Sequence, residues 1–545
     1  MTNSHKLRVA FIFFLLLLLY MLVLFNLYLI QIKQQNFYKD LATKQYATTV
    51  THMPPRAAIY DRNGEPLAIN HDSLAAFLLP KQIKDKQEVM KFLNKHFPEA
   101  AEKLKTTDKH FMYIQRKLTE EQIKLIEKSK LDDIQILKEP SRYYSLDAAA
   151  PVVGVTDIDN TGIAGIEMIF NDRLAGKASS CLLEKDARSG HFYFTKELIG
   201  SGKQGEPITL TIDSDLQYLA FEELKRSIDS FKAKEGSVLI MDPDSGDILA
   251  MVSYPTFDPN NTKNISLDHM KNRVLTDAHE PGSVIKVYLA LAALEEGVVT
   301  PEELIDCENT KQGYVNGARF GTLVPHGVIP FADVVAYSNN IGVAKVATRL
   351  GPKLYDHYKA VGFGEKSVLN WPGEQKGFIN PPRNWSRPSI VSLSFGYEIR
   401  ITILQLATAL SIVINNGIPV IPRLLINPEL PVPMTCKQPL YSEETLAAVR
   451  DILERTTMKG TARRARIKGY NVIGKTGTAN LVVDGTYSSD HNIFTFSGIV
   501  EKGNYRRIIV TFVKDAGIKN LRATRTAVPL FEKVAEKMLI HDKVL

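Results

Sequence analysis

Three short groups of residues in this 545-residue chain combine hydroxyl, amine and amide side chains. The first lies in "HEPGSVIKVYLALAALEEG" (His279 to Gly297), where Ser283 follows a Pro-Gly pair and Lys286 comes three residues later. Pro-Gly favours a turn, and the apolar run after it predicts a buried helix that begins near Ser283. On that helix Lys286 lies one turn further along the same face. A lysine in an apolar pocket loses part of its preference for the charged form, so it can act as the base that activates a serine.

The spacing Ser-x-x-Lys is a weak indication by itself, because a serine that caps a helix is common. Ser283 is nevertheless the only serine in the chain with a lysine at that spacing. A second group, "YSNNIGVAK", places Ser338 and Asn340 two residues apart. The hydroxyl can pass a proton to a leaving group, and the amide can orient Lys286 and hold a substrate amide. Alone, this fragment is equally typical of an Asn-rich helix cap.

The third group is Lys475-Thr476-Gly477-Thr478, in the strand-like run "GYNVIGKTGTAN". Lys475 and the Thr476 hydroxyl can bind a carboxylate, and Gly477 allows a substrate backbone to approach closely. The N–H of Thr478 can join that of Ser283 as an oxyanion hole. Alone, this group is also typical of a glycine-containing turn.

The region from residue 210 onward has the elements needed to bring these groups together. An N-capped helix ("TIDSDLQYLAFEELKRSIDSF") precedes a hairpin ("GSVLIMDPDSGDILAMVSYP"), and residues 272–416 are mostly helical in pattern. Strands return at "NVIGKTGTAN", "NIFTFSGIVEKG" and "YRRIIVTFVKD", before a closing helix at "AVPLFEKVAEKMLI". This order predicts one antiparallel sheet covered by helices. The proline-bearing stretch 427–439 is predicted to be a surface loop.

Residues 36–205 have mixed α+β signals and no evident chemistry of their own. "PPRAAIYDRNGEPLAIN" predicts two strands joined by a tight turn, because Asn-Gly supplies the positive φ that such a turn needs. "KDKQEVMKFLNKHF" and "TEEQIKLIEKSK" are helical in period, the second with a capping threonine, and "HFMYIQRKL" predicts a strand.

The segment from Val9 to Ile30 has no charged residue and is long enough to cross a bilayer as a helix. No cleavage site of small residues follows it, so we interpret it as an uncleaved anchor. Lys6 and Arg8 precede the segment, which favours an N-terminus in the cytoplasm and about 500 residues outside it. Lys33 and Lys39 weaken that bias.

Bulk composition excludes several classes of protein. The chain is 44% hydrophobic and 23% charged, which is ordinary for a globular protein, and its length predicts two or more domains. A net charge of +7 with scattered basic residues argues against a nucleic-acid groove. The three cysteines, Cys181, Cys307 and Cys436, fit neither a disulfide framework nor a metal site.

Together and in this order, Ser-x-x-Lys, Ser-x-Asn and Lys-Thr-Gly are the signature of β-lactamases and penicillin-binding proteins. The chain resembles a class B penicillin-binding protein, a membrane-anchored peptidoglycan D,D-transpeptidase. "IYDRNGEPLA" and "GIAGIEMIFNDRLAG" resemble the N-terminal pedestal of that family, and "MDPDSGDILAMVSYPTFDPN" resembles its transpeptidase domain. "YSNNIGVAK" and "LSFGYEIRITILQLATA" are closer to the division-specific (FtsI-type) branch than to the elongation branch.

The resemblance implies an α+β fold with three parts: a penicillin-binding transpeptidase domain (an antiparallel sheet covered by helices), an N-terminal α+β pedestal domain and one transmembrane helix. We expect a cytoplasmic tail at 1–8, the anchor at 9–32, a pedestal (dimerisation-like) domain at 33–209 and the transpeptidase domain at 210–545. The catalytic domain is then extracytoplasmic or periplasmic, on a single-pass protein of the cytoplasmic (inner) membrane.

The resemblance also implies a reaction. Ser283 attacks the penultimate D-Ala carbonyl of a stem peptide, expels D-Ala and passes the acyl group to an amine on a neighbouring stem. Lys286, Ser338, Asn340 and Lys475 would be the other catalytic residues, and β-lactams would acylate the same serine. No metal or organic cofactor is needed. The expected partners are a SEDS-family glycosyltransferase and other division proteins, and the expected place is the division septum.

Three departures from the family pattern stand out: Val287 where proline is frequent, and Glu398 and Ala57 where glycine is typical. Other functions remain open: an elongation-type transpeptidase, a D,D-carboxypeptidase or serine β-lactamase, or a catalytically weak penicillin-binding scaffold or sensor. The pedestal argues against a β-lactamase, and the three intact motifs argue against a decayed site. Sensors usually have further spanning helices or a cytoplasmic module.

Overall fold

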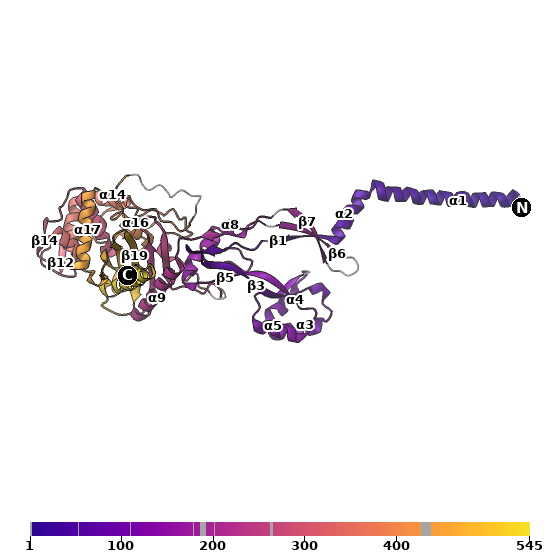
Figure 1. Ribbon diagram of the computed structural model, residues 1–545, viewed down its shortest axis with the longest axis horizontal. Coiled ribbons are helices and arrows are strands. Elements are labelled where there is room, and N and C mark those ends of the chain that lie inside the picture. Colours follow the sequence, from indigo (N-terminus) through magenta and orange to yellow (C-terminus); the bar gives the residue numbers. More distant parts are fainter. Residues whose placement is uncertain are drawn as a thin grey trace. The chain divides into compact units, whose positions relative to one another are not determined.

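The computed structural model divides into two compact units, Met1–Pro55 with Ala175–Gly205, and Arg56–Leu174 with Glu206–Leu545 (Figure 1). It describes residues 3–545 except 53, 110, 178, 186–191, 201, 262–264 and 427–437. The proline-bearing stretch predicted to be a surface loop therefore lies almost entirely outside the described residues. Cys307 carries a free thiol, whereas the side chains of Cys181 and Cys436 are outside the described part.

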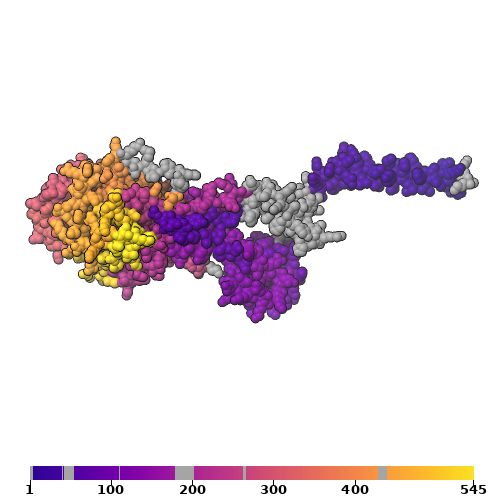
Figure 2. Space-filling model, in the orientation of Figure 1, coloured from indigo at the N-terminus to yellow at the C-terminus, as the bar shows by residue number. Residues whose placement is uncertain are grey.

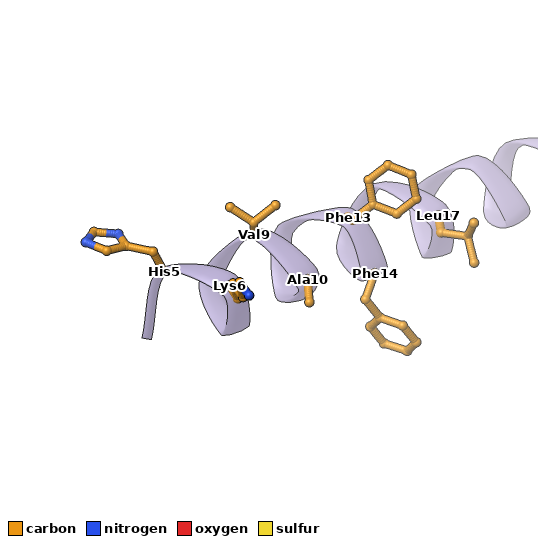
Figure 3. Close-up of a pocket in the computed structure, with 7 residues that line it drawn as sticks. All are labelled: His5, Lys6, Val9, Ala10, Phe13, Phe14 and Leu17. Atoms are coloured by element: carbon orange, nitrogen blue, oxygen red, sulfur yellow. The ribbon is translucent and has the colours of Figure 1, made fainter. Parts of the chain in front are cut away.

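The first unit begins with a long apolar helix, α1 (Asn3–Tyr28), which continues as a π-helical turn (Leu29–Lys33). Ser4–Lys33 is the one segment of the described chain that is long and apolar enough to cross a membrane, and its most apolar window buries no surface in the protein. Figure 3 shows His5 and Lys6 at the start of α1, followed by apolar side chains that project outward from the helix. This helix matches the anchor predicted from the sequence.

The rest of the first unit consists of one helix and one small sheet. Helix α2 (Gln35–Tyr46) leads into a three-stranded antiparallel sheet in the order β1-β6-β7. Its strands are β1 (Ala47–His52), β6 (Ser179–Lys185) and β7 (Phe192–Gly200). The sequence did not reveal this pairing, because β1 and β6 lie about 130 residues apart along the chain.

The second unit begins with a sheet in the order β4-β3-β2-β8, with β5 paired to β3. The strands are β2 (Ile59–Tyr60), β3 (Pro66–Leu78), β4 (Met112–Gln115), β5 (Gln135–Tyr144) and β8 (Ile208–Thr209). Three helices pack on its outer part around a core of their own: α3 (Lys86–His96), α4 (Pro98–Thr106) and α5 (Glu120–Ser129). The predicted hairpin, helices and strand of this region are confirmed, including the capping box of Thr119.

A five-stranded antiparallel sheet forms the centre of the remaining part, in the order β10-β9-β19-β18-β17. Its strands are β9 (Ala233–Met241), β10 (Ile248–Tyr254), β17 (Asn471–Val483), β18 (Thr486–Lys502) and β19 (Tyr505–Ala516). The predicted N-terminal hairpin therefore pairs with the C-terminal strands through β9 and β19. This confirms the single antiparallel sheet.

Helices cover both faces of the sheet. Successive side chains of a strand point to opposite faces, so alternate residues belong to two different hydrophobic cores. Val238 and Ile240 face α9 (Ser214–Phe231) and α18 (Ala527–His541). Leu239 and Met241 face the opposite core, which contains α11 (Lys286–Glu295), α16 (Ile403–Ser411) and α17 (Glu443–Met458). The sequence therefore buries apolar side chains on both sides of the sheet, as a fully covered sheet requires.

Residues 272–416 contain several helices, but these make up less than half of the stretch, so the prediction of a mostly helical middle is only partly right; short two-stranded pairings, which the sequence did not indicate, lie between them. The helices are α10 (Arg273–Thr276), α12 (Phe331–Ala336), α13 (Asn340–Leu350), α14 (Lys353–Ala360) and α15 (Ser389–Ser394). The strand pairs are β11 (Leu304–Asp306) with β14 (Val328–Pro330), β12 (Gln312–Val315) with β13 (Ala318–Gly321), and β15 (Phe378–Ile379) with β16 (Ile399–Arg400).

The turn after β2 is hydrogen-bonded to the N-terminal end of helix α9. Asp61 Oδ2 accepts hydrogen bonds from the backbone N–H (3.1 Å) and the hydroxyl (2.8 Å) of Ser214, and Asn63 donates to Asp213 at 3.0 Å. Figure 2 shows indigo, magenta and yellow surface, from an early segment, from residues near 200 and from the end of the chain, on one face of this unit. The first and last segments of the unit are therefore part of one packed body.

Candidate active site

Ser283 lies in a 3₁₀ turn, Gly282–Ile285, that packs directly against strand β17. Two glycines make this close approach possible. A Cβ on Gly477 would lie 2.5 Å from the Pro281 carbonyl oxygen, and one on Gly282, which has a φ of +58°, would lie 2.6 Å from the Thr478 carbonyl oxygen. The sequence predicted a helix from Ser283; the structure forms one 3₁₀ turn first, and α11 begins at Lys286.

Lys286 is completely buried and surrounded by polar atoms of the second motif. Its Nζ donates to the carbonyl oxygen of Ser338 (2.9 Å), to the Ser338 hydroxyl (3.1 Å) and to Oδ1 of Asn340 (2.5 Å). Burial, and then the nearby charge of Lys475, hold the pKa of Lys286 well below its ordinary value. Such burial favours the neutral form of the amine, which has the free electron pair that a base needs.

The second motif is positioned by the link between α12 and α13. Ser338 adopts a φ of +61°, and Asn339 caps α13 by accepting from the N–H groups of Ile341 and Gly342. Asn340 opens that helix and donates from Nδ2 to the Gly321 carbonyl at 2.7 Å, so its Oδ1 faces Lys286. The orientation of the amide is therefore fixed by partners on both sides.

Lys475 is the second fully buried amine, and it lies on β17 beside the nucleophile turn. Burial lowers its pKa to about 7, and its Nζ donates to the Thr476 carbonyl oxygen at 3.2 Å. The Thr476 hydroxyl lies 2.8 Å from that of Thr461. In the described part of the chain, neither Lys286 nor Lys475 forms an ion pair with a carboxylate.

The three motifs converge on one pocket of about 960 Å³. Five of the eight predicted residues line it: Ser283, Ser338, Asn340, Thr476 and Thr478. Lys286 and Lys475 are buried beneath the pocket lining, and each contacts residues of that lining. Gly477 allows the turn that contains Ser283 to pack closely, and its role in the approach of a substrate backbone stays a prediction.

Sequence reasoning assigned no role to several residues of this pocket: Thr461, Tyr397, Tyr487, Arg319 and Arg522. Thr461 had no recognisable signal, because its partner Thr476 lies 15 residues away on another element. Glu398 was noted only as a departure from a typical glycine. Its φ of +58° explains why glycine suits that position.

This arrangement is suited to acyl transfer. It combines a serine in the turn before a helix, a buried lysine with a lowered pKa, a second hydroxyl in contact with that lysine, and a strand next to the serine. No described hydrogen bond involves the Ser283 hydroxyl, so transfer of its proton to Lys286 stays a prediction.

Two family profiles match the chain. Residues 236–536 match "Penicillin binding protein transpeptidase domain" and residues 51–210 match "Penicillin-binding Protein dimerisation domain". The first match alone spans more than half of the chain. The chain belongs to the penicillin-binding protein transpeptidase family. The resemblance to class B penicillin-binding proteins, drawn from the motifs, is thereby confirmed.

Curated relatives support the same assignment. Peptidoglycan D,D-transpeptidase FtsI of Escherichia coli (strain K12) is 29% identical over 508 residues, covering 90% of this chain and 84% of that protein. Stage V sporulation protein D of Bacillus subtilis (strain 168) is 30% identical over 484 residues, covering 84% and 74%. Similar identity to FtsI and to a sporulation protein means that these relatives do not distinguish the branches of the family.

Solved structures confirm the fold. Penicillin-binding protein 3 of Mycobacterium tuberculosis, in complex with aztreonam, superposes with a TM-score of 0.70 at 24% identity, covering 91% of this chain and 98% of that one. A peptidoglycan synthetase of Bifidobacterium adolescentis gives the same TM-score at 22% identity. The predicted fold, a penicillin-binding transpeptidase domain preceded by an α+β pedestal, is therefore correct.

Proposed function

We propose that this chain is a serine D,D-transpeptidase that cross-links peptidoglycan stem peptides. One observation carries the proposal: a fully buried lysine without a carboxylate partner contacts Ser338 and Asn340 in the same pocket as Ser283. Structural lysines are rarely buried unpaired, because the charged form is costly in an apolar interior. A perturbed amine in contact with a hydroxyl is instead typical of a nucleophilic site.

In the acylation step, the Ser283 oxygen attacks the carbonyl carbon of the penultimate D-Ala, and its proton passes to Lys286 Nζ. The N–H groups of Ser283 and Thr478 stabilise the negative oxygen of the tetrahedral intermediate. The C–N bond then breaks, and Ser338 delivers a proton to the departing amine while recovering one from Lys286. The products are free D-Ala and an ester on Ser283.

In the second step, an amine of a neighbouring stem attacks the ester carbon, the C–O bond to Ser283 breaks, and the proton of the amine returns to the Ser283 oxygen through Ser338 and Lys286. Asn340 holds the peptide amide, and Lys475 with the Thr476 hydroxyl binds the terminal carboxylate before the first step. β-Lactams would enter the same route and stop at the ester. No step requires a metal ion or an organic cofactor.

We infer further that the protein works at the division septum, as the name FtsI of a relative suggests. The α1 helix would anchor it in the cytoplasmic membrane with the N-terminus inside, which the basic residues Lys6 and Arg8 favour. A SEDS-family glycosyltransferase would supply the glycan strands, in contact with the anchor and the pedestal. We also propose that the anchor spans residues 9–32, the pedestal residues 33–209 and the transpeptidase domain residues 210–545.

The activity is tested with the full-length chain in detergent and glycan strands that carry pentapeptide stems. We expect equal release of D-Ala and formation of cross-linked dimers, both lost in Ser283→Ala. Release of D-Ala without dimers would indicate a D,D-carboxypeptidase. Release of neither by a folded wild-type chain would contradict the enzymatic proposal.

The cellular role and orientation are tested separately. Depletion of the protein in its own bacterium should give filaments that fail to divide, whereas rounded cells would indicate the elongation branch. A periplasmic reporter enzyme fused after residue 545 should be active, and the same reporter fused before residue 3 should not. The reverse pattern would overturn the proposed topology.

A further inference from the structure

Glu398 lines the pocket that contains Ser283, and its backbone is strained. Its φ of +58° lies in the left-handed region, which glycine adopts without cost and glutamate does not. The backbone carbonyl oxygen and N–H of Glu398 make hydrogen bonds that any residue could make, so the backbone contacts do not require glutamate here. A charged side chain held in a strained conformation at a pocket wall indicates a function for that side chain.

The carboxylate of Glu398 has no cationic partner. Its Oε2 accepts from the amide of Asn380 at 2.5 Å, and within the described residues no lysine, arginine or histidine nitrogen lies within ion-pair distance. A second carboxylate is adjacent, because the N–H of Glu398 donates to Oε1 of Glu280 at 3.2 Å. Burial raises the pKa of Glu280, and the hydrogen bonds that it accepts from Tyr487 and from the Glu398 N–H, with the charge of Arg400, only partly oppose that effect.

Two tyrosines complete this side of the pocket. The rings of Tyr397 and Tyr487 meet edge to face at 4.9 Å, and both residues belong to the pocket lining. Tyr487 donates its hydroxyl to Glu280 at 3.0 Å, and the Tyr397 hydroxyl accepts from the N–H of Asn480 at 3.2 Å. Burial raises the pKa of both phenols, so they stay neutral and their ring faces attract cations.

In the described part of the chain, neither arginine of the pocket lining, Arg319 or Arg522, forms an ion pair with Glu398. Arg319 donates from Nε and Nη2 to Gln312, and Arg522 immediately precedes Ala523, whose N–H donates to Thr478 Oγ1 at 3.4 Å. Glu398 directly follows Tyr397 in the chain, and the Tyr397 hydroxyl is hydrogen-bonded to Asn480, which lies two residues beyond Thr478 on β17. The pocket therefore offers a carboxylate and two aromatic rings on its Asn480 side.

We propose that Glu398 is a specificity-determining residue whose carboxylate binds a positively charged amine of the substrate stem peptide, with Tyr397 and Tyr487 as the flanking walls. This inference rests on the proposed function, because the acyl group of a stem peptide is passed to an amine and the stems therefore carry one. Binding of the ammonium form concentrates that group next to the acylated serine. The subsite takes substrates with a free amine in preference to those with a neutral or acidic group there.

The first test uses two β-lactams that differ by one amino group, ampicillin and penicillin G, on the full-length chain in detergent at pH 7. At this pH an α-amino group is mostly protonated. We measure the second-order rate constant of Ser283 acylation by each. Glu398→Gln should lower the ratio of the ampicillin to the penicillin G constant by about fivefold, the size of one partly solvated ion pair, with little change for penicillin G.

Two further variants separate charge from folding. Glu398→Gly removes the carboxylate and relieves the backbone strain, so it should fold at least as well as the wild type and lower the ratio similarly. Glu365→Gln, an exposed carboxylate outside the pocket lining that pairs with Lys359, should leave the ratio unchanged. An unchanged ratio in both Glu398 variants overturns the proposal, as does an equal loss for the two drugs.

The second test uses stem pentapeptides with a free or an acetylated side-chain amine and follows release of D-Ala. We expect kcat/KM to favour the free amine in the wild type and the preference to disappear in Glu398→Gln. If the wild type is acylated by penicillin but shows no preference, only the Glu398 proposal fails. If neither penicillin acylates the wild type, the proposed transpeptidase function fails with it.

Discussion

Two groups of fully buried charged residues lie in the second unit, and they are built in opposite ways. Near its start, Glu167 lies in α7 (Gly165–Ile169) between two guanidinium groups, with Arg56 Nε at 2.5 Å and Arg142 Nε at 2.6 Å. In the pocket, Lys286 and Lys475 are equally buried but have no carboxylate partner among the described residues. In the first group, opposite charges pair with one another. In the second group, burial lowers the pKa of both lysines and so favours their uncharged form.

This difference separates structure from chemistry. A buried carboxylate that accepts from two guanidinium groups joins three segments of chain and gains nothing by changing its protonation. A buried lysine without a counter-ion is kept partly or wholly neutral, which costs stability but provides a base. The two groups should therefore respond oppositely when one member is replaced by a neutral residue of similar size.

The largest expected effect is on catalysis. Lys286→Met keeps the length of the side chain and removes the base, so the rate constant of penicillin acylation should fall by about 10³-fold or more. The free energy of unfolding should stay equal or rise, because no buried amine remains. Stopped-flow acylation and thermal unfolding of the same preparation measure both. A strongly destabilised Lys286→Met would erase the contrast between the two groups.

The second effect is on stability. Glu167→Gln leaves two buried guanidinium groups without their carboxylate and should lower the free energy of unfolding by roughly 3–5 kcal/mol. Replacing Arg56, Arg142 and Glu167 together by methionine should recover much of that loss, because no unpaired charge is then buried. Thermal and denaturant unfolding measure the change. Near-wild-type stability of the single variant would show that the pairing is not structural.

The third effect is a pH dependence of stability that comes from Lys475. Burial lowers the pKa of Lys475 from an ordinary value of 10.5 to about 7. Between these values the unfolded chain binds a proton that the folded chain does not, so stability rises with pH, by at most about 1.4 kcal/mol per pH unit. Lys475→Met should remove this contribution.

The measurement for Lys475 is the difference in unfolding free energy between wild type and variant, followed from about pH 7.5 to about pH 9.5. The wild type should gain stability relative to Lys475→Met as the pH rises. The exposed Lys353→Met serves as the matched control and should show no such trend. A flat difference for Lys475→Met would mean that the amine keeps its proton in the folded protein.

The smallest effect is expected where a charge pair is exposed. Glu303 pairs with Arg349 at 2.5 Å, with roughly a third or more of each side chain exposed. Glu303→Gln should change the free energy of unfolding by less than about 1 kcal/mol. Chemical denaturation is sufficient to detect this. A loss as large as that of Glu167→Gln would show that burial does not set the scale of these effects.

Features that depend on neighbouring residues were predictable from the sequence. The capping box of Thr119, the N-cap of α9 and the strands of the central sheet were expected because their signals lie within one element. The three catalytic motifs were recognised for the same reason, since each spans four residues or fewer. Their order along the chain was enough to identify the family.

Features that depend on distant partners were not predictable. Arg56 and Glu167 are 111 residues apart, and the region that contains them showed no evident chemistry in the sequence. Thr461 beside Thr476, the positive φ of Glu398 and the pairing of β1 with β6 also arise only when the chain is folded. The packing of Pro281 against Gly477 could not be foreseen either, because the two residues are distant in the chain.

The most direct test of the account is the mass of the intact full-length protein after brief exposure to penicillin G. We predict one added penicilloyl group, located on the peptide that contains Ser283, and its absence in Ser283→Ala. The same adduct on the alanine variant would contradict Ser283 as the nucleophile. Absence of any adduct on the folded wild type would contradict the proposed active site as a whole.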